Sequence, residues 1–435
     1  MIGFLINPFK SLVTDKSISF DVIFFSTLLF LMPIALITGP AIPDIFLSLI
    51  ALYFLIKSIW KKKWHYYQNP IVYGFLFFCF YGITGSIFSE MPFESLTTGG
   101  SAFYFRYIFF ALGVWYLLDT NRHLSKCLLN ISIICIFFVC IDASYQYFFD
   151  FNIFGNKKHS DIRLTGLFGD EPIVGRYIAY LSIFTFVLIY QNYFKQQKIM
   201  KLSIAFLILC EVTVFLSGER APLFSLILFS LLIVIFVSNF RIYKIISIFF
   251  SIIIILCITL FNPNAKSRIV DLTISQVKQT QIPFLPYSDH HEEHYISALK
   301  MFNKNPIFGI GANLFRFQCN KPEYKYKTRS CNSHPHNFYV QTLVELGIFG
   351  FGFLVIFFLY LLSICIRKLP LISPLNRIKE LPFDYFLYPI ILITYWWPLI
   401  PHMNFYNNWN NVLIMLPLGF FMRYLYGNSN NGNSN

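Results

Sequence analysis

Long apolar runs recur along the whole chain, and they constrain its fold more than any other feature. A helix needs roughly 17 to 25 mostly apolar residues to cross the hydrocarbon core of a bilayer. Of the 435 residues, 56% are hydrophobic and only 13% are charged, whereas soluble domains carry about 25% charged residues. The pattern predicts an all-α fold, a polytopic membrane helix bundle.

The apolar runs predict about twelve transmembrane helices, divided by one long polar loop. We expect nine spans within residues 1–261, a large loop at 262–336 with helical content, three spans within 337–426, and a disordered polar tail at 427–435. The predicted spans are 20–37, 41–60, 70–88, 100–118, 124–149, 172–194, 202–217, 222–239, 244–261, 337–366, 384–401 and 409–426.

Basic residues cluster in alternate connections between these spans, and this alternation predicts the orientation. Short loops rich in lysine and arginine stay in the cytoplasm, so both termini are expected there. The loops on the opposite face include 150–171, 218–221, 262–336 and 402–408. The net charge of +13 is explained by this topology signal, and no nucleic acid is expected as a partner.

Histidines gather on the face opposite the basic loops, which suggests chemistry there because histidine titrates near neutral pH. One group lies in "HHEEHYISALKMF" (290–302), whose apolar spacing predicts an amphipathic helix. The spacing of His290, His291 and His294 is compatible with zinc, but HExxH is absent and no cysteine pair completes a site. We therefore expect a solvated helix face and no metal. Cys319 and Cys331 could form a disulfide in an oxidising compartment or remain reduced.

The stretch "HPHNFYVQTLVELGIFG" (334–350) brings titratable groups to the start of an apolar run. Pro335 disfavours helix at His334, so the helix is expected to begin at or just after Pro335, with His336 in its first turn. The positive end of a helix disfavours a protonated imidazole, so His336 would be neutral and able to act as a general base. The alternative is an interfacial histidine without a catalytic role.

Asn337, Gln341 and Glu345 continue this stretch as a polar stripe that runs into the membrane. A carboxyl group at that depth must face the bundle interior or a wet cavity, and it requires a partner. Glu345 could therefore serve the site or form half of a structural pair. Gly347, together with Gly350 and Gly352, is expected to let another helix approach closely.

Four arginines are predicted near the same membrane surface. Arg220 lies in "LSGERAPLF" (216–224), Arg163 and Arg176 lie in "RLTGLFGDEPIVGRYIAY" (163–180), and Arg268 begins the long loop. Arginines at a membrane boundary suit a phosphate presented at bilayer level. Alternatively, they reach to lipid headgroups or are neutralised by nearby acidic residues, namely Asp142, Asp170, Glu171, Glu211 and Glu219.

Together these motifs resemble the O-antigen ligase and O-antigen polymerase superfamily. "HNFYVQTLVELGIFG" matches that family's pattern of His-Asn, nine residues and Gly-x-x-Gly, and "SGERAPLF" is similar to its short arginine segment. Two further stretches, "RLTGLFGDEPIVGRYIA" and "ALKMFNKNPIFGIGANLF", resemble other family segments, so the likeness covers roughly residues 160 to 352 in the family's order. One departure is Glu219, where many relatives carry a small polar residue.

The resemblance implies a metal-independent glycosyltransferase with no cofactor in the bacterial inner membrane, with its active site facing the periplasm. Its donor would be a glycan on undecaprenyl diphosphate, and its acceptor lipid A-core or a growing glycan. By this resemblance His336 would deprotonate or orient the acceptor hydroxyl, and Arg220 with a further loop arginine would hold the diphosphate, so His336 and Arg220 are the expected catalytic residues. From their own positions we expect the substrate-binding residues to be Arg163, Arg176, Arg268, Asn337 and Glu345.

Three functions follow from these observations, in decreasing order of support. A ligase is favoured because ligases of this superfamily tend to have one dominant periplasmic loop. A polymerase would use the same donor. A transporter would use Glu345, Glu211 and Asp142 as ion-coupling residues, but the sequence contains no inverted repeat to support it.

Overall fold

The computed structural model describes residues 10–97, 100–160, 163–261, 266–267, 271, 274–275, 289–367 and 386–427. Within these ranges every regular element is a helix, and extended pairing is limited to two isolated bridges. The predicted all-α membrane bundle is therefore confirmed. Arg268 and the tail after Gly427 lie outside the described residues, as does most of 262–288.

Eight of the described helical segments are long and apolar enough to cross a membrane, and a bent pair formed by α2 (Phe20–Phe30) and Met32–Thr38, which contains α3 (Met32–Ala35), could be a ninth. Two of the eight are the composite segments Pro92–Thr120, which contains α6 (Pro92–Leu96) and α7 (Arg106–Thr120), and Ser238–Phe261, which contains α12 (Arg241–Phe261). The others are α4 (Ala41–Trp60), α5 (Pro70–Ile87), α8 (Leu124–Phe149), α9 (Val174–Tyr193), α10 (Gln197–Leu216) and α17 (Phe338–Ile366).

The other three predicted spans correspond to helices that are shorter or more polar than a typical span. α11 (Arg220–Phe236) has 17 residues, and α19 (Leu387–Tyr395) has 9. α20 (Asn408–Tyr426) is longer, but its first turn carries Asn408, Asn410 and Asn411. The count of twelve spans therefore stays a prediction.

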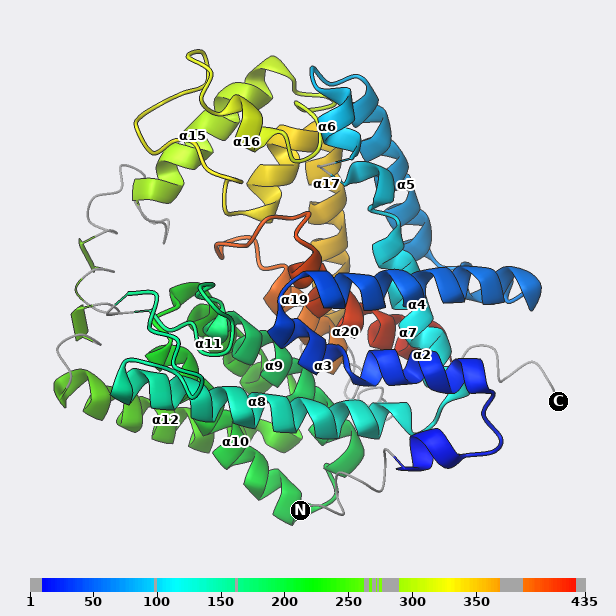
Figure 1. Cartoon of the computed structure of the whole chain (residues 1–435), viewed down its shortest axis with the longest axis vertical. Coiled ribbons are helices and arrows are strands. Elements are labelled where there is room, and N and C mark those ends of the chain that lie inside the picture. Colours follow the sequence, from blue (N-terminus) through cyan, green and yellow to red (C-terminus); the bar gives the residue numbers. More distant parts are fainter. Residues whose placement is uncertain are drawn as a thin grey trace.

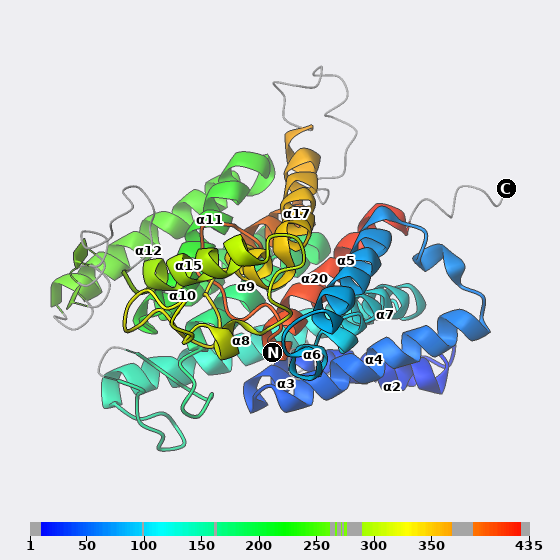
Figure 2. The same ribbon diagram turned by 90° about the horizontal axis from the view of Figure 1, so that it is seen from above.

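The helices form two groups, and within the bundle α17 packs mainly on α5 and α19. Figure 2 shows α8 to α12 on one side and α4, α5, α7 and α20 on the other. α15 (Asp289–Lys304) and α16 (Phe315–Gln318) lie over the end at which α17 begins (Figure 1). α9 is the most deeply buried of the spanning helices, so the start of α9, where Arg176 lies, has a fixed position in the bundle.

α17 is broken at Gly347, and a loop enters the break. Gly347 has φ +66° and ψ −165°, a region that is essentially restricted to glycine. The Ile348 N–H donates to the Pro306 carbonyl at 2.9 Å, and the Gly311 N–H donates to the Glu345 carbonyl at 3.0 Å. The expectation that another helix approaches this glycine is wrong, because the polar backbone groups freed at the break bind residues 306–311 instead.

Gly347→Ala is expected to destabilise the protein. A Cβ atom there would lie 1.9 Å from the Ile307 carbonyl oxygen, and the backbone conformation costs a non-glycine residue on the order of 1–3 kcal/mol even without the clash. The matched control is Gly352→Ala, because a Cβ at Gly352 has no neighbour within 4 Å. Thermal unfolding in detergent should show a lower Tm for Gly347→Ala alone. Equal Tm values for both variants would contradict this account of the break.

Loops predicted for one face of the membrane meet in the structure. Leu164 binds Ser217 through the backbone at 3.3 Å, and His402 binds His336 at 2.7 Å. Ser95 Oγ donates to the Ala312 carbonyl at 3.1 Å. The alternation of loops read from the basic residues is consistent with these contacts.

The identity of that face as the periplasm remains a prediction, which reporter fusions can test. A reporter fused after Asn320 should be active in the periplasm, and one fused after Lys63 should be active in the cytoplasm. The reverse pattern would overturn the orientation.

Candidate functional site

His336 lies just outside α17, not in its first turn. The helix begins at Phe338 and is capped by Asn337, whose Oδ1 accepts the N–H groups of Tyr339 at 2.9 Å and Val340 at 3.1 Å. Asparagine is a preferred N-cap residue, and this preference moves the start of the helix two residues beyond the position expected from Pro335. His336 itself has φ +57°, so the chain turns sharply at the imidazole.

The loop between α19 and α20 fixes the backbone around His336. The His402 N–H donates to the His336 carbonyl at 2.7 Å. The His402 ring stacks on Phe338 with ring centroids 4.1 Å apart, and a nitrogen of His334 lies 3.2 Å from the His402 carbonyl oxygen. These contacts join two segments that are more than sixty residues apart in the chain, and they hold the imidazole in one place.

Asn332 identifies the basic nitrogen of His336. The Ser333 N–H donates to Asn332 Oδ1 at 2.7 Å, which directs the Asn332 amide nitrogen toward His336. That amide nitrogen lies 3.0 Å from His336 Nε2. An amide N–H can only donate, so Nε2 carries the lone pair and Nδ1 carries the proton. An acceptor hydroxyl that replaced the exposed Asn332 amide would meet the same lone pair.

The surroundings keep the His336 imidazole neutral. Burial lowers its pKa to about 4, and electrostatic interactions with His294 and Arg176 act in the same direction. The sequence predicted a neutral imidazole for another reason, the field of the helix end. The state is as expected, but its causes are desolvation and electrostatic interactions with two residues from other elements.

α15 brings two further histidines to His336, which corrects the expectation of a solvated helix face. His294 is buried, and the ring centroids of His291 and His294 lie 5.6 and 5.5 Å from that of His336. The i,i+3 spacing was the available signal, but it could not show which surface the helix covers. In the described part of the chain, no three His, Cys, Asp or Glu side chains converge in a way that could hold a metal ion.

Three segments, 313–316, 333–336 and 401–407, line a polar cavity of about 500 Å³ beside His336, together with Arg176. Two cationic side chains, Arg176 and Arg316, face it, and none of its lining residues carries a carboxylate. The cavity therefore favours an anionic or hydroxyl-rich ligand. Its lining consists of Arg176, Asn313, Arg316, Ser333, His334, His336, Pro401, His402, Met403, Asn404, Tyr406 and Asn407.

Next to this cavity, Arg163, Arg176 and Arg220 gather around the buried Glu219. The Glu219 carboxylate accepts the Gly175 N–H at 2.6 Å, at the start of α9. Burial raises the pKa of Glu219 to about 7, and the charges of Arg176 and Arg163 oppose that rise. Arg163 also acts electrostatically on Arg220. Arg176 thus belongs both to this arginine cluster and to the lining of the cavity.

Two of the other acidic residues considered as partners for these arginines, Glu211 and Asp142, are engaged elsewhere. Glu211 forms a buried ion pair with Lys244, and Asp142 Oδ1 accepts the Ile153 N–H at 2.9 Å. Arg106, which lies within the predicted span 100–118, pairs with Asp44 at 2.9 Å.

Residues 204–355 match the family model described as O-antigen ligase. The chain carries the domain of the O-antigen ligase superfamily. The matched range includes Arg220 and His336 but not Arg163 or Arg176. No curated protein matches the chain.

Within the O-antigen ligase domain, Asn337 and Glu345 bind other parts of the protein. Asn337 Nδ2 donates to the Pro398 carbonyl at 2.7 Å. Glu345 is fully buried, where it accepts the Phe315 N–H at 3.1 Å and a Gln341 N–H at 3.1 Å. These bonds hold the loops that line the cavity, and direct substrate contact by either side chain stays a prediction.

The O-antigen ligase domain also contains a cavity residue that sequence reasoning did not single out. Arg316 follows directly after Phe315, the residue tethered by Glu345, and its guanidinium donates to Asn313 Oδ1 at 2.9 Å. Its position depends on the loop that enters the break in α17, so no local pattern marks it. Cys319, about one turn further along, forms a disulfide with Cys331, with their Cα atoms 4.9 Å apart.

Proposed function

We propose that this protein is an O-antigen ligase-type glycosyltransferase. It transfers a glycan from undecaprenyl diphosphate to lipid A-core at the periplasmic face of the inner membrane, without a metal ion. One observation carries the proposal: a neutral histidine with its lone pair directed toward an exposed position shares a cavity with two arginines and no carboxylate. This set supplies a base for an acceptor hydroxyl and cations for a leaving diphosphate.

In the proposed reaction, His336 Nε2 accepts the proton of the acceptor hydroxyl. The hydroxyl oxygen then bonds to the anomeric carbon of the donor, and the bond from that carbon to the phosphate oxygen breaks. The electron pair of that bond remains on the diphosphate. A base within hydrogen-bond reach of the reacting hydroxyl contributes typically 10²–10⁴-fold to such a step.

The arginines would stabilise the diphosphate as it leaves. Guanidinium groups bind phosphate oxygens in a bidentate manner, and they act strongly where water is excluded. Arg176 belongs to both the cavity and the arginine cluster, so it can contact the phosphate nearest the sugar. Arg220 and Arg163 would then bind the phosphate nearer the lipid.

Purified protein incubated with the lipid-linked glycan and an acceptor tests this proposal. Release of undecaprenyl diphosphate together with a glycosylated acceptor is expected, and chelators should leave the rate unchanged. A transporter would move the donor without releasing diphosphate, and that result would overturn the proposal.

A deletion strain separates the two enzymatic functions. Lipopolysaccharide without any O-antigen is expected for a ligase. A single repeat left on the core would show that the same site polymerises the glycan instead.

A further inference from the structure

We propose that the polyprenyl chain of the donor lies in an apolar groove between α11 and α12, an assignment that rests on the proposed function. The groove has a volume of about 590 Å³ and is lined by α11, α12 and the end of α10. Nearly all of its lining is aliphatic, with Glu211, Ser230 and Ser251 as the polar members.

The groove begins directly below the arginine cluster. α11 starts at Arg220, and the first α11 residue in the groove is Leu223, less than one turn further. The lining continues along α11 to Val234, a length of about 16 Å at ~1.5 Å per residue. A lipid whose diphosphate is bound near Arg220 would therefore direct the first part of its chain into this groove, while the rest extends into the bilayer.

Both walls are open toward the surrounding lipid. Ile227 on α11 has 58% of its surface exposed, and Ile252 on α12 has 50%. Exposed isoleucines form an apolar surface to which a flexible polyprenyl chain can bind in more than one conformation. The groove can be entered sideways from the membrane, as a substrate that resides there requires.

Polar contacts attach α12 to α10. For this reason the apolar side chains of α12 need not pack tightly against α11, and the groove between the two helices stays open. The only buried residues of α12 are Lys244, Ser247 and Ser251. All three bind the Glu211 carboxylate of α10, the serines at 3.2 and 2.5 Å and the lysine through its ammonium. Because α12 is fixed through this stripe, its isoleucines are left to line the groove opposite α11.

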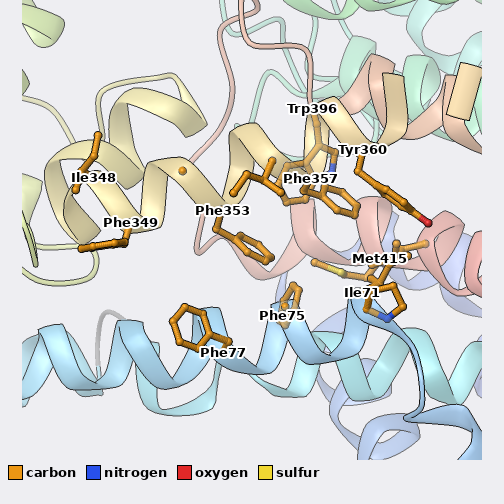
Figure 3. Close-up of a pocket in the computed structure, with 15 residues that line it drawn as sticks. Ile71, Phe75, Phe77, Ile348, Phe349, Phe353, Phe357, Tyr360, Trp396 and Met415 are labelled. Carbon is orange, nitrogen blue, oxygen red and sulfur yellow. The ribbon is translucent and has the colours of Figure 1, made fainter. Parts of the chain in front are cut away.

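A second apolar groove, of about 450 Å³, provides a comparison. It lies between α5 and α17, where aromatic side chains of the two helices face one another (Figure 3). Its α17 lining begins at Ile348, about 15 Å from the start of that helix at ~1.5 Å per residue. None of its lining residues is charged, so nothing at this groove would bind the anionic end of the donor.

Binding of undecaprenyl diphosphate and of inorganic diphosphate to the purified protein in detergent tests the assignment. Ile227→Trp and Ile252→Trp add bulk to opposite walls at exposed positions, where folding should be little affected. Each variant is expected to weaken binding of undecaprenyl diphosphate by about tenfold, the effect of roughly two CH₂ groups losing their site. Binding of inorganic diphosphate should not change. Gly352→Trp, which adds the same side chain to the groove between α5 and α17, should alter neither affinity.

The outcomes separate this inference from the proposed function. Suppose that inorganic diphosphate binds wild type, Ile227→Trp and Ile252→Trp equally, and that undecaprenyl diphosphate does so too. The groove then holds ordinary phospholipid, and the inference is wrong. A reduction caused by Gly352→Trp alone would assign the chain to the other groove. If neither diphosphate binds the wild type, the proposed function itself fails.

Discussion

His336→Asn is expected to reduce glycan transfer by about 10²–10⁴-fold, the contribution of a positioned general base. Asparagine is among the few residues that tolerate the left-handed backbone conformation found at His336, so the loop should keep its shape. Its amide cannot accept a proton from a hydroxyl. Transfer should be measured with purified protein whose Tm matches wild type. His159→Asn, an exposed histidine predicted for the same face, is the control and should retain full activity.

The pH dependence follows from the direction of the His336 pKa shift. Burial lowers the pKa to about 4, so the imidazole is neutral and basic at any pH well above 4. The limb of the rate profile that reports this base should be flat from about pH 5 upward and should fall as pH decreases through 4. A limb near pH 6.5, the ordinary value for histidine, or near-normal transfer by His336→Asn would show that another group is the base.

Arg220→Ala and Arg176→Ala are expected to inactivate the protein by weakening its hold on the diphosphate. A hydrogen bond to a charged group contributes roughly 1.5–3 kcal/mol, so each loss should reduce donor affinity by about 10- to 100-fold. Arg220→Lys should recover little, because an ammonium group cannot reproduce the bidentate geometry of a guanidinium on phosphate.

The arginine variants should change the dissociation constant of the donor, whereas the histidine variant should change the rate constant of the chemical step. Donor affinity should fall in Arg220→Ala and Arg176→Ala, whereas His336→Asn should bind the donor almost normally and fail in the chemical step. Arg122→Ala, whose side chain is 79% exposed in a loop predicted to be cytoplasmic, serves as the control. Unchanged donor affinity in both arginine variants would remove these residues from the diphosphate site.

The sequence alone determined the class of fold and was sufficient to single out two candidate motifs, because both depend on local properties. Hydropathy over a run of about twenty residues is sufficient to predict a spanning helix, and alternating basic loops predict orientation. Arg220 at the start of α11 and His336 before α17 could be recognised from their neighbours in the chain. The position of Pro335 predicts that α17 starts at or just after this residue. The helix starts at Phe338 instead, because Asn337 is a strong N-cap residue.

Only the tertiary structure decided which groups share the site, because those contacts join distant segments. His294 and Arg176 reach His336 from α15 and from the start of α9, and neither position follows from a periodic pattern. Arg316 faces the cavity because residues 306–311 enter the break at Gly347 and Glu345 binds the next turn. The helical repeat in a sequence shows which residues share one face of a helix. It cannot show that the backbone polar groups freed at the break in α17 bind residues 306–311, and this binding positions the loop that carries Arg316.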